Sequence, residues 1–171
     1  MPNGIEIERK YIIFMPDIES VSAFRGYTRS EITQTYLSAK DGIARRVRKR
    51  EYADGSVVYT ETIKSRIDNI SVNEDEREIS AAEYDAMLSE IKEGTHPLNK
   101  TRHTFEYKGH TIEIDVYPNW TRFCIMEIEL ESRDEDAEIP SFIKILYEVT
   151  GDKRYSNAKM AEVFPPEPDE N

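Results

Sequence analysis

The chain has 171 residues, of which 38% are hydrophobic and 33% are charged, and its net charge is −11. This acidity excludes general binding to nucleic acids, because their phosphates would be repelled. No apolar run approaches the roughly 20 residues that cross a bilayer, the N-terminus lacks a signal-peptide pattern, and the single cysteine, Cys124, cannot form an internal disulfide. We therefore expect one soluble domain in the cytoplasm, without nucleic-acid or membrane partners.

Strand-like segments dominate the chain. The expected strands span residues 4–14, 32–39, 43–53, 56–65, 70–79, 99–107, 110–118 and 123–132. Tight links at Asp41-Gly42, Asp54-Gly55 and Lys108-Gly109 are typical of antiparallel hairpins. The pattern predicts a mainly β fold with helices (α+β), namely an eight-stranded antiparallel closed β-barrel with the helices packed outside.

Helices are fewer. We expect them at residues 17–25, 81–93 and 141–149, with a last helical turn at 157–163. Ser80 and Glu83 form a capping box before the second helix, and an apolar stripe after Pro140 predicts the third. Residues 165–171 are acidic and proline-rich, so we expect a disordered tail after a domain of residues 1–164.

Charged residues recur at every second position of the predicted strands, so they share one face of each strand. Glu6, Glu8 and Lys10 share such a face, and the apolar Ile5 and Ile7 lie on the other. The remaining charged faces carry Arg46, Arg48 and Arg50; Thr60, Thr62 and Lys64; Glu74, Glu76 and Glu78; Lys100 and Arg102; Glu113 and Asp115; and Glu127, Glu129 and Glu131. A sheet with one wet face would explain each strand alone. The interleaved signs and the number of strands favour a closed tunnel with a charged lining.

Such a lining suits a chain of phosphates. Its six cationic side chains would be costly together without an anionic ligand; they are Lys10, Arg46, Arg48, Lys64, Lys100 and Arg102. Guanidinium groups bind phosphate oxygens bidentately, and lysines act as point charges. Carboxylates and phosphate oxygens together hold Mg²⁺. The lining therefore predicts a phosphate chain bridged by Mg²⁺ or Mn²⁺.

The ordered set of motifs resembles the triphosphate tunnel metalloenzymes, or CYTH superfamily, from about residue 4 to about residue 163. The family signature ExExK is matched by Glu6-Ile7-Glu8-Arg9-Lys10. Further similar segments are Arg46-Val47-Arg48, Thr62-Ile63-Lys64, Glu76-Arg77-Glu78, Lys100-Thr101-Arg102, Glu113-Ile114-Asp115, Glu127-Ile128-Glu129-Leu130-Glu131 and Tyr155-Ser156-Asn157. The resemblance, to compact bacterial members above all, implies a barrel around a tunnel and a divalent-metal-dependent enzyme that acts on triphosphates.

The resemblance also implies roles by position. The metal would be held by Glu6, Glu8, Glu127 and Glu129. The phosphates would be held by Lys10, Arg46, Arg48, Lys64, Lys100 and Arg102, with Arg154 and Lys159 as candidates for a further cation. Glu78 and Asp115 would support the metal and the nucleophilic water, and Lys10 is a candidate base, although we rank it first as a phosphate ligand.

Several functions remain open at this point. We favour a hydrolase that attacks inorganic tripolyphosphate with an activated water and releases phosphate. The alternatives are a class IV-type adenylate cyclase, which makes cyclic AMP and pyrophosphate from ATP, a non-catalytic module that binds polyphosphate or nucleotides, and an ordinary sheet protein. The expected partner is a small-molecule triphosphate, and a homodimer is left open.

Overall fold

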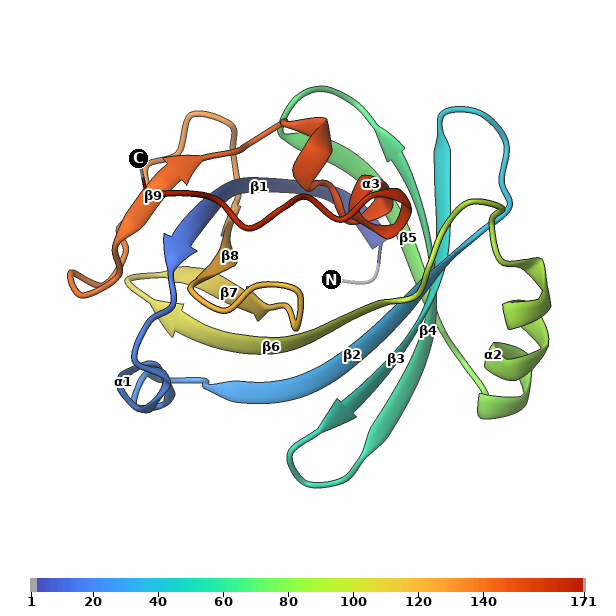
Figure 1. Cartoon of the computed structure of the whole chain (residues 1–171), viewed down its shortest axis with the longest axis horizontal. Helices are drawn as coiled ribbons and strands as arrows, with labels where there is room; N and C mark the ends of the chain where they lie inside the picture. The colour runs from blue at the N-terminus through green and yellow to red at the C-terminus, as the bar shows by residue number, and fades with distance from the viewer. Residues whose placement is uncertain (1–2, 171) are drawn as a thin grey trace.

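The computed structural model describes residues 3–170, so residues 1 and 2 of the predicted domain and residue 171 of the predicted tail lie outside the described residues. Figure 1 shows the strands wrapped into a barrel with short helices around it. The strands are β1 (Asn3–Phe14), β2 (Thr28–Leu37), β3 (Ile43–Tyr52), β4 (Val57–Arg66), β5 (Ser71–Ile79), β6 (Leu98–Tyr107), β7 (His110–Val116), β8 (Phe123–Leu130) and β9 (Ile145–Glu148). The helices are α1 (Ile18–Ser22), α2 (Ala81–Met87) and α3 (Asn157–Glu162), with short 3₁₀ turns η1 (Leu88–Glu90) and η2 (Lys153–Tyr155).

Eight antiparallel strands close the barrel in the order β5-β4-β3-β2-β6-β7-β8-β1. Closure comes from β1, which pairs with β8 along Ile7–Phe14 and with β5 along Asn3–Ile7. Each strand therefore has a neighbour on both sides, which satisfies its backbone hydrogen bonds. The predicted eight-stranded antiparallel barrel is confirmed.

The ninth strand replaces a predicted helix. Residues 141–149 do not form the expected helix, because β9 pairs with Tyr11–Ile13 of β1. The edge of β1 is free there, since β5 pairs with β1 only as far as Ile7. An unpaired strand edge is a strong template for pairing, and it outweighs the helical spacing of the apolar residues.

Other elements match with shifted ends. β2 spans Thr28–Leu37 in place of 32–39, and α1 is shorter than 17–25. The capping box is confirmed, because the Ser80 hydroxyl accepts from the Glu83 amide at 3.0 Å and a Glu83 carboxylate oxygen accepts from the Ser80 amide at 3.2 Å. α2 ends at Met87 and not at residue 93, and the 3₁₀ turn η1 follows it directly.

Much of the apolar core lies on the outside of the barrel wall. Ile112, Ile114, Met126 and Ile128 point away from the interior and are buried with Val21 of α1. The helix α2 lies against the outer faces of β3 and β4 (Figure 1). The outward apolar residues are therefore covered, as the sequence pattern requires, which leaves the inward faces to the charged side chains.

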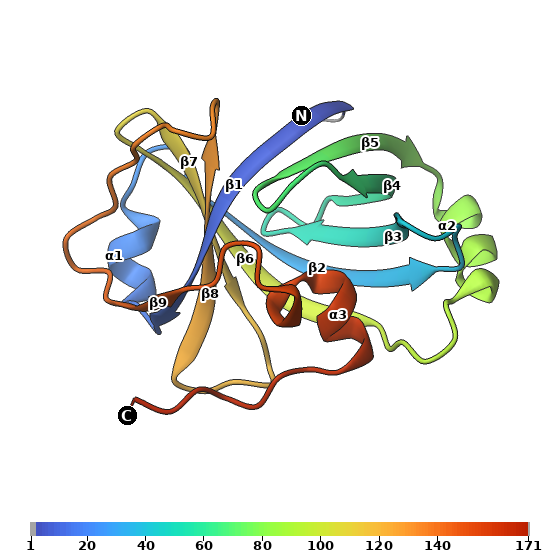
Figure 2. The ribbon, with the colours of Figure 1, turned by 90° about the horizontal axis from the view of Figure 1, so that it is seen from above.

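One end of the barrel interior is apolar. Along the inward face of β1, Lys10 is followed by Ile12 and Phe14, which pair with Ile125 and Phe123 of β8. A buried cluster at this end contains Ile12, Phe123, Ile125 and Met160 of α3. The helix α3 lies beside β2 and β6 (Figure 2). The charged stretch of the tunnel is thus bounded at one end by packed side chains.

The segment after residue 164 contacts this end. The indole of Trp120 donates to the Pro165 carbonyl at 3.1 Å, and the amides of Thr121 and Arg122 donate to the Glu167 carboxylate at 3.0 and 2.6 Å. The β7–β8 turn thus offers partners that composition does not reveal, and the disordered tail stays a prediction.

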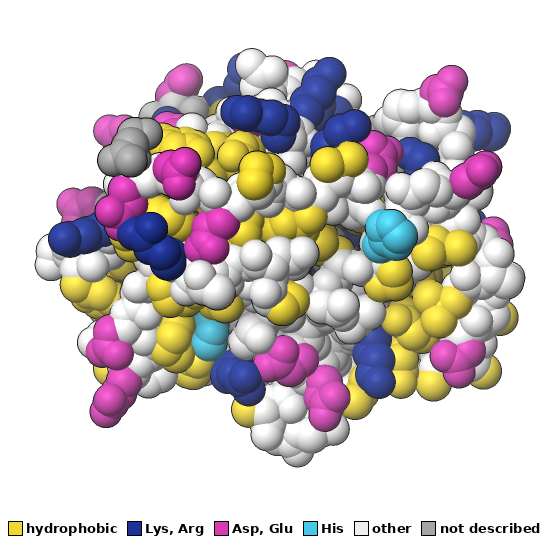
Figure 3. Space-filling view, in the orientation of Figure 1, with side chains coloured by type: hydrophobic (Ala, Val, Ile, Leu, Met, Phe, Trp, Pro, Cys, Tyr) yellow, Lys and Arg dark blue, Asp and Glu magenta, His cyan; other side chains and the backbone are white. Residues whose placement is uncertain are grey.

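The outer surface mixes charges of both signs. Figure 3 shows acidic, basic and apolar side chains interspersed on one face of the molecule. No helix within the described residues is long and apolar enough to span a membrane.

Candidate active site in the barrel interior

Neighbouring strands place opposite charges side by side on the inward face. The register aligns Lys10 with Glu127, Lys64 with Glu74, and Arg102 with Asp115. Cross-strand neighbours on one face lie about 5 Å apart at their Cβ atoms, so opposite charges can pair directly. The alternation of signs along the sequence is therefore the pattern of ion pairs across the barrel wall.

Asp115 holds two of the cations. The Lys100 Nζ donates to Asp115 Oδ2 at 2.8 Å, and Arg102 donates through Nε to Oδ1 at 2.7 Å and through Nη2 to Oδ2 at 2.8 Å. Burial alone would raise the pKa of Asp115, but Arg102 and Lys100 hold it well below its usual range. Both oxygens of Asp115 are thus engaged with these two cations, and its support of the metal and the nucleophilic water stays a prediction.

Lys10 and Glu127 form a second buried pair. Lys10 Nζ lies 3.4 Å from Glu127 Oε1, and it donates to the Tyr155 carbonyl at 3.0 Å. Burial opposes ionisation of both groups, but the pKa of Lys10 is raised by Glu127, and that of Glu127 is lowered to about 2 by Lys10 and Arg102. A lysine with a raised pKa stays protonated, so this environment favours Lys10 as a phosphate ligand over Lys10 as a base.

Arg46 and Arg48 carry donors without partners. Both side chains are buried, at 5% and 8% exposure, and Arg48 Nη2 donates to Gln34 Oε1 at 3.1 Å. The Nε groups of both arginines and the Nε2 of Gln34 have no hydrogen-bond partner among the described residues. Burial and, after it, the adjacent Arg46 and Arg102 together lower the pKa of Arg48 to about 9. Buried, crowded and unpaired cationic donors form a site that an anion would stabilise.

Lys100 belongs to the same cationic group. Its side chain has no exposed area. Burial is the main cause that lowers the pKa of Lys100 to about 7; Asp115 raises this pKa, and the charges of Arg102 and Arg48 lower it. A bound anion would raise this pKa again, so the ammonium is best stabilised when phosphate is present.

Carboxylates crowd the other part of the interior. Glu6 and Glu74 share a hydrogen bond, and Lys64 Nζ lies 3.8 and 3.7 Å from their Oε2 atoms. Burial and the hydrogen bond with Glu6 raise the pKa of Glu74 to about 7. Burial and the nearby Glu127 raise the pKa of Glu8 well above its usual value. Carboxyl groups that keep protons near neutral pH can exchange them for a cation.

These carboxylate oxygens are suitable ligands for a hard divalent cation, but by themselves they do not form a complete coordination shell. Within residues 3–170, no three acidic, histidine or cysteine side chains stand in a cluster that could hold a metal ion alone. Mg²⁺ commonly takes only one or two carboxylates and completes its shell with water and phosphate oxygens. Glu129 faces Glu8 across the register, is exposed, and has a pKa raised to about 7 by desolvation and by Glu113 and Glu6.

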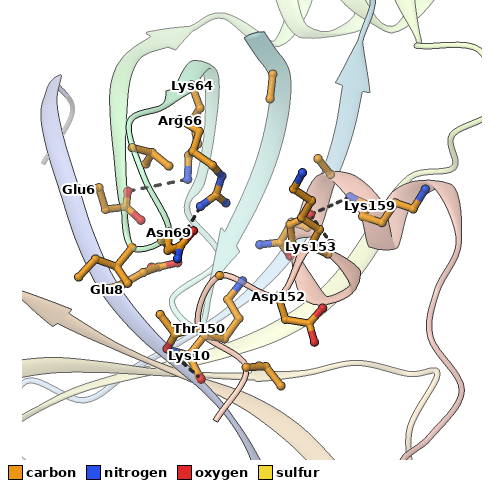
Figure 4. Close-up of a pocket in the computed structure, with 18 of the residues that line it drawn as sticks. Glu6, Glu8, Lys10, Lys64, Arg66, Asn69, Thr150, Asp152, Lys153 and Lys159 are labelled. Atoms are coloured by element: carbon orange, nitrogen blue, oxygen red, sulfur yellow. Dashed lines mark hydrogen bonds and ion pairs between the residues drawn. The ribbon is translucent and has the colours of Figure 1, made fainter. Parts of the chain in front are cut away.

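A cavity of about 430 Å³ opens into this interior. Figure 4 shows Glu6, Glu8 and Lys64 on one side of it, with Lys153 and Lys159 of the C-terminal segment on the other. The cavity also reaches the interior side chains Lys10, Arg46 and Tyr36. Some of the interior cations and carboxylates therefore share one accessible space.

Eight predicted site residues do not line this cavity. Six of them lie on the inward faces of the barrel strands, namely Arg48, Lys100, Arg102, Asp115, Glu127 and Glu129, and the other two are Glu78 and Arg154. Glu78 shares the inward side of β5 but is exposed, opposite Thr60. Arg154 is 72% exposed and pairs with Asp152 at 2.7 Å; Asp152 and Lys159 line the cavity, but Arg154 does not. The period of a strand fixes the face of a side chain but not its depth, and Glu78 lies too near the end of β5 to be enclosed.

Other interior groups have no site role in the sequence analysis, although some of them fit the period of two. Glu74 and Glu76 lie deeper than Glu78, and Glu76 accepts from the Thr62 hydroxyl at 2.8 Å. A polar residue at an inward position, as in Gln34, could have been found by the same period of two. Asn157 lies outside the barrel strands, so no spacing rule points to it.

The sequence model of the CYTH domain matches residues 4–164. The chain belongs to the CYTH domain family. An inorganic triphosphatase of Acetivibrio thermocellus is 30% identical over 161 residues, which cover 93% of this chain and 94% of that protein. The crystal structure of the inorganic triphosphatase NE1496 matches with a TM-score of 0.58 and 28% identity over 94% of this chain and 96% of that one. A Bacillus halodurans structure with a provisional adenylate cyclase name shares the fold alone, at 19% identity, a TM-score of 0.51 and coverage of 78% and 84%.

The family resemblance of the motifs is thus confirmed. In this CYTH domain the ExExK residues Glu6, Glu8 and Lys10 all line the cavity. The roles of the individual side chains in binding and catalysis stay predictions.

Proposed function

We propose that this CYTH domain hydrolyses triphosphates with the help of a divalent cation, and that its substrate is inorganic tripolyphosphate. The observation that carries the proposal is the group of buried, unpaired donors of Arg46, Arg48 and Gln34 beside crowded carboxylates. The two inorganic triphosphatases among its relatives support the same activity. A chain of phosphates would satisfy the donors, and a cation would neutralise the carboxylates.

The phosphates would be held by the interior cations. These are Lys10, Arg46, Arg48, Lys64, Lys100 and Arg102, with Lys159 at the rim. A water would attack the terminal phosphorus, the bridging P–O bond would break, and orthophosphate, pyrophosphate and one proton would result. The fixed cations would offset the charge on the transferring group, which is most of what phosphoryl transfer requires.

Glu6, Glu8, Glu127 and Glu129 would hold Mg²⁺ or Mn²⁺, with Glu74 as a further oxygen donor. Such an ion lowers the pKa of a bound water and polarises phosphoryl oxygens. Because Glu127 is also paired with Lys10, its carboxylate would link the two halves of the site.

The lining of the cavity favours an inorganic substrate over a nucleotide. Tyr36 is the one aromatic residue among the described residues that line it. Its hydroxyl hydrogen-bonds Arg46, which ties the ring to the cationic wall. A nucleobase would therefore find little stacking surface.

The direct test is a substrate panel. Phosphate release is measured with tripolyphosphate, ATP, GTP and thiamine triphosphate, each with Mg²⁺, Mn²⁺ or EDTA, and cyclic AMP is measured with ATP. We expect the fastest release from tripolyphosphate, none in EDTA, and slower metal-dependent turnover for Glu129→Gln, whose exposed side chain is not needed for folding. Cyclic AMP would instead establish the cyclase, and ligand-induced stabilisation without turnover would establish a binding module. The cytoplasmic location and the homodimer stay predictions from the sequence.

A further inference from the structure

The segment Tyr155–Asn157 reaches into the site from the C-terminal part of the chain. It connects η2 to α3, which lies over the barrel opening in Figure 1. The Ser156 hydroxyl accepts from the Lys159 amide at 3.2 Å and caps α3. Ser156 is thus the N-cap residue, Tyr155 precedes it, and Asn157 is the first residue of α3.

Two interior lysines have the same kind of surroundings. Lys10 Nζ contacts one carboxylate, Glu127 at 3.4 Å, and one neutral oxygen, the Tyr155 carbonyl at 3.0 Å. Lys100 Nζ likewise contacts Asp115 Oδ2 at 2.8 Å and Asn157 Oδ1 at 3.4 Å. Both neutral oxygens come from the residues that flank Ser156.

An ammonium group has three N–H donors. With one carboxylate and one neutral oxygen as acceptors, Lys100 uses two of them, and its ammonium has no third acceptor among the described residues. Two fixed acceptors determine where the third N–H points. A carboxylate alone would draw the ammonium against the wall, whereas a second, neutral acceptor holds it away without adding negative charge that would repel a triphosphate.

The oxygen of Asn157 is itself oriented. The hydroxyl of Tyr117 donates to Asn157 Oδ1 at 2.9 Å, and the Tyr117 side chain is buried. The ring of Tyr117 also lies 5.8 Å from Lys100 Nζ, within range of a cation–π interaction. Tyr117 therefore keeps the amide oxygen directed at the lysine.

We propose that Asn157 is a positioning residue: with Tyr117, it aims the third N–H of Lys100 at a phosphate of the substrate, as the Tyr155 carbonyl does for Lys10. The inference rests on the proposed function, because it names a phosphate as the group that receives this N–H. It predicts that the segment Tyr155–Asn157 is part of the site and does not only cover the barrel opening.

The first test does not depend on turnover. The ¹⁵Nζ resonances of the lysines are recorded at about pH 6, where Lys100 is mostly protonated because its pKa is about 7. Lys100→Met assigns its signal. We expect a resolved Lys100 ammonium signal in the wild type and in Asn157→Asp, which keeps an acceptor, and a broadened or shifted signal in Asn157→Leu, which has none. An unchanged Lys100 signal in a folded Asn157→Leu protein overturns the inference.

The second test is kinetic and uses the same variants with tripolyphosphate. We expect Asn157→Leu to lower kcat by about tenfold or more, because a small misplacement of a substrate-binding group is costly. Asn157→Asp should restore most of kcat but raise KM, since its added charge repels the substrate. Ser156→Ala, which weakens the helix cap but keeps the Asn157 oxygen, should stay near wild type in kcat. An equal loss in Ser156→Ala and Asn157→Leu would show a merely structural role.

The two levels of the proposal can fail separately. If the wild type releases no phosphate from any triphosphate while the Lys100 signal follows the predicted pattern, the function is wrong and the fixing of Lys100 by Asn157 stands. If the wild type is active but Asn157→Leu keeps both its signal and its kcat, the positioning role is wrong and the function stands.

Discussion

Burial determines what each charged side chain of the interior can do. Asp115, with 1% of its side chain exposed, is committed to Lys100 and Arg102, whereas the less enclosed Glu74 shares a hydrogen bond with Glu6 and has a pKa near 7. The same carboxyl chemistry therefore serves two purposes. Deep carboxylates fix the cations, and those nearer the opening can receive a metal ion.

Breaking the deepest ion pair should cost stability. Asp115→Asn leaves Lys100 and Arg102 buried without their carboxylate, so we expect the free energy of unfolding to fall by about 3–5 kcal/mol in urea titrations. Glu138→Gln is the control, because the Glu138–Lys108 pair is exposed and should contribute less than about 1 kcal/mol. Similar losses of unfolding free energy in the two variants would show that the buried ion pair contributes no more to stability than an exposed one. Tripolyphosphate should recover part of the loss in Asp115→Asn.

His103 should make stability depend on pH. It is buried on the outer side of β6, with its Nδ1 2.9 Å from the Tyr27 hydroxyl, and burial together with Arg29 lowers its pKa. As the pH falls through the unfolded-state pKa of about 6.5, the unfolded chain gains a proton before the folded protein does, so stability is lost. Between about pH 8 and pH 5.5, the wild type should lose up to about 1.4 kcal/mol per pH unit more unfolding free energy than His103→Gln. Parallel curves for the two proteins would contradict this.

At the residue scale, the sequence predicts which face of a strand a side chain lies on, but it predicts poorly how deeply that side chain is buried in the barrel. The period of two correctly assigns Glu6, Lys10 and Arg48 to the interior, because side chains must alternate along a strand. It assigns Glu78 to the same interior, although the end of β5 leaves that residue exposed. Depth depends on where a strand ends relative to its neighbours, which no single strand records.

Elements are decided by competition between local preference and available partners. α2 follows its own sequence, because its capping box and apolar stripe agree with its position outside β3 and β4. β9 does not, because the free edge of β1 beyond Ile7 offers hydrogen bonds that a short helix cannot match. The hairpin turns were predictable from their glycines, whereas the pairing of β9 with β1 depends on a contact between distant parts of the chain.

The cap of α2 should contribute to stability alone. Ser80→Ala removes one half of the capping box, so we expect a loss of about 1 kcal/mol in the free energy of unfolding. Turnover should be unchanged, since α2 lies outside the barrel. Ser89→Ala, which removes an exposed hydroxyl beyond the helix, is the control and should change stability by less than about 0.5 kcal/mol. A loss of turnover in Ser80→Ala would show that the outer face is coupled to the interior.

The whole molecule combines a charged tunnel with apolar packing at one end. The barrel as such could be predicted from the number of strands and their tight turns. The apolar end could not, because it brings together Ile12, Trp120 and Met160, which belong to three separate parts of the chain. This end holds α3 in place, and through it the segment that contacts Lys10 and Lys100.

We propose that the buried cations of the tunnel are arranged for a triphosphate rather than for the stability of the fold. Arg48 supports this most directly, because its Nε has no partner among the described residues, and burial together with like-charged neighbours lowers its pKa to about 9. Removing it should relieve repulsion in the free protein and remove a charged hydrogen bond from the complex.

The most direct measurement is calorimetric titration of tripolyphosphate into the wild type and Arg48→Met in EDTA, where no turnover consumes the ligand. We predict binding to the wild type and at least roughly tenfold weaker binding to Arg48→Met, corresponding to a charged hydrogen bond of about 1.5–3 kcal/mol, with an unfolding temperature equal to or above that of the wild type. Equal affinity in the two proteins, or a marked loss of stability in the variant, would contradict the claim.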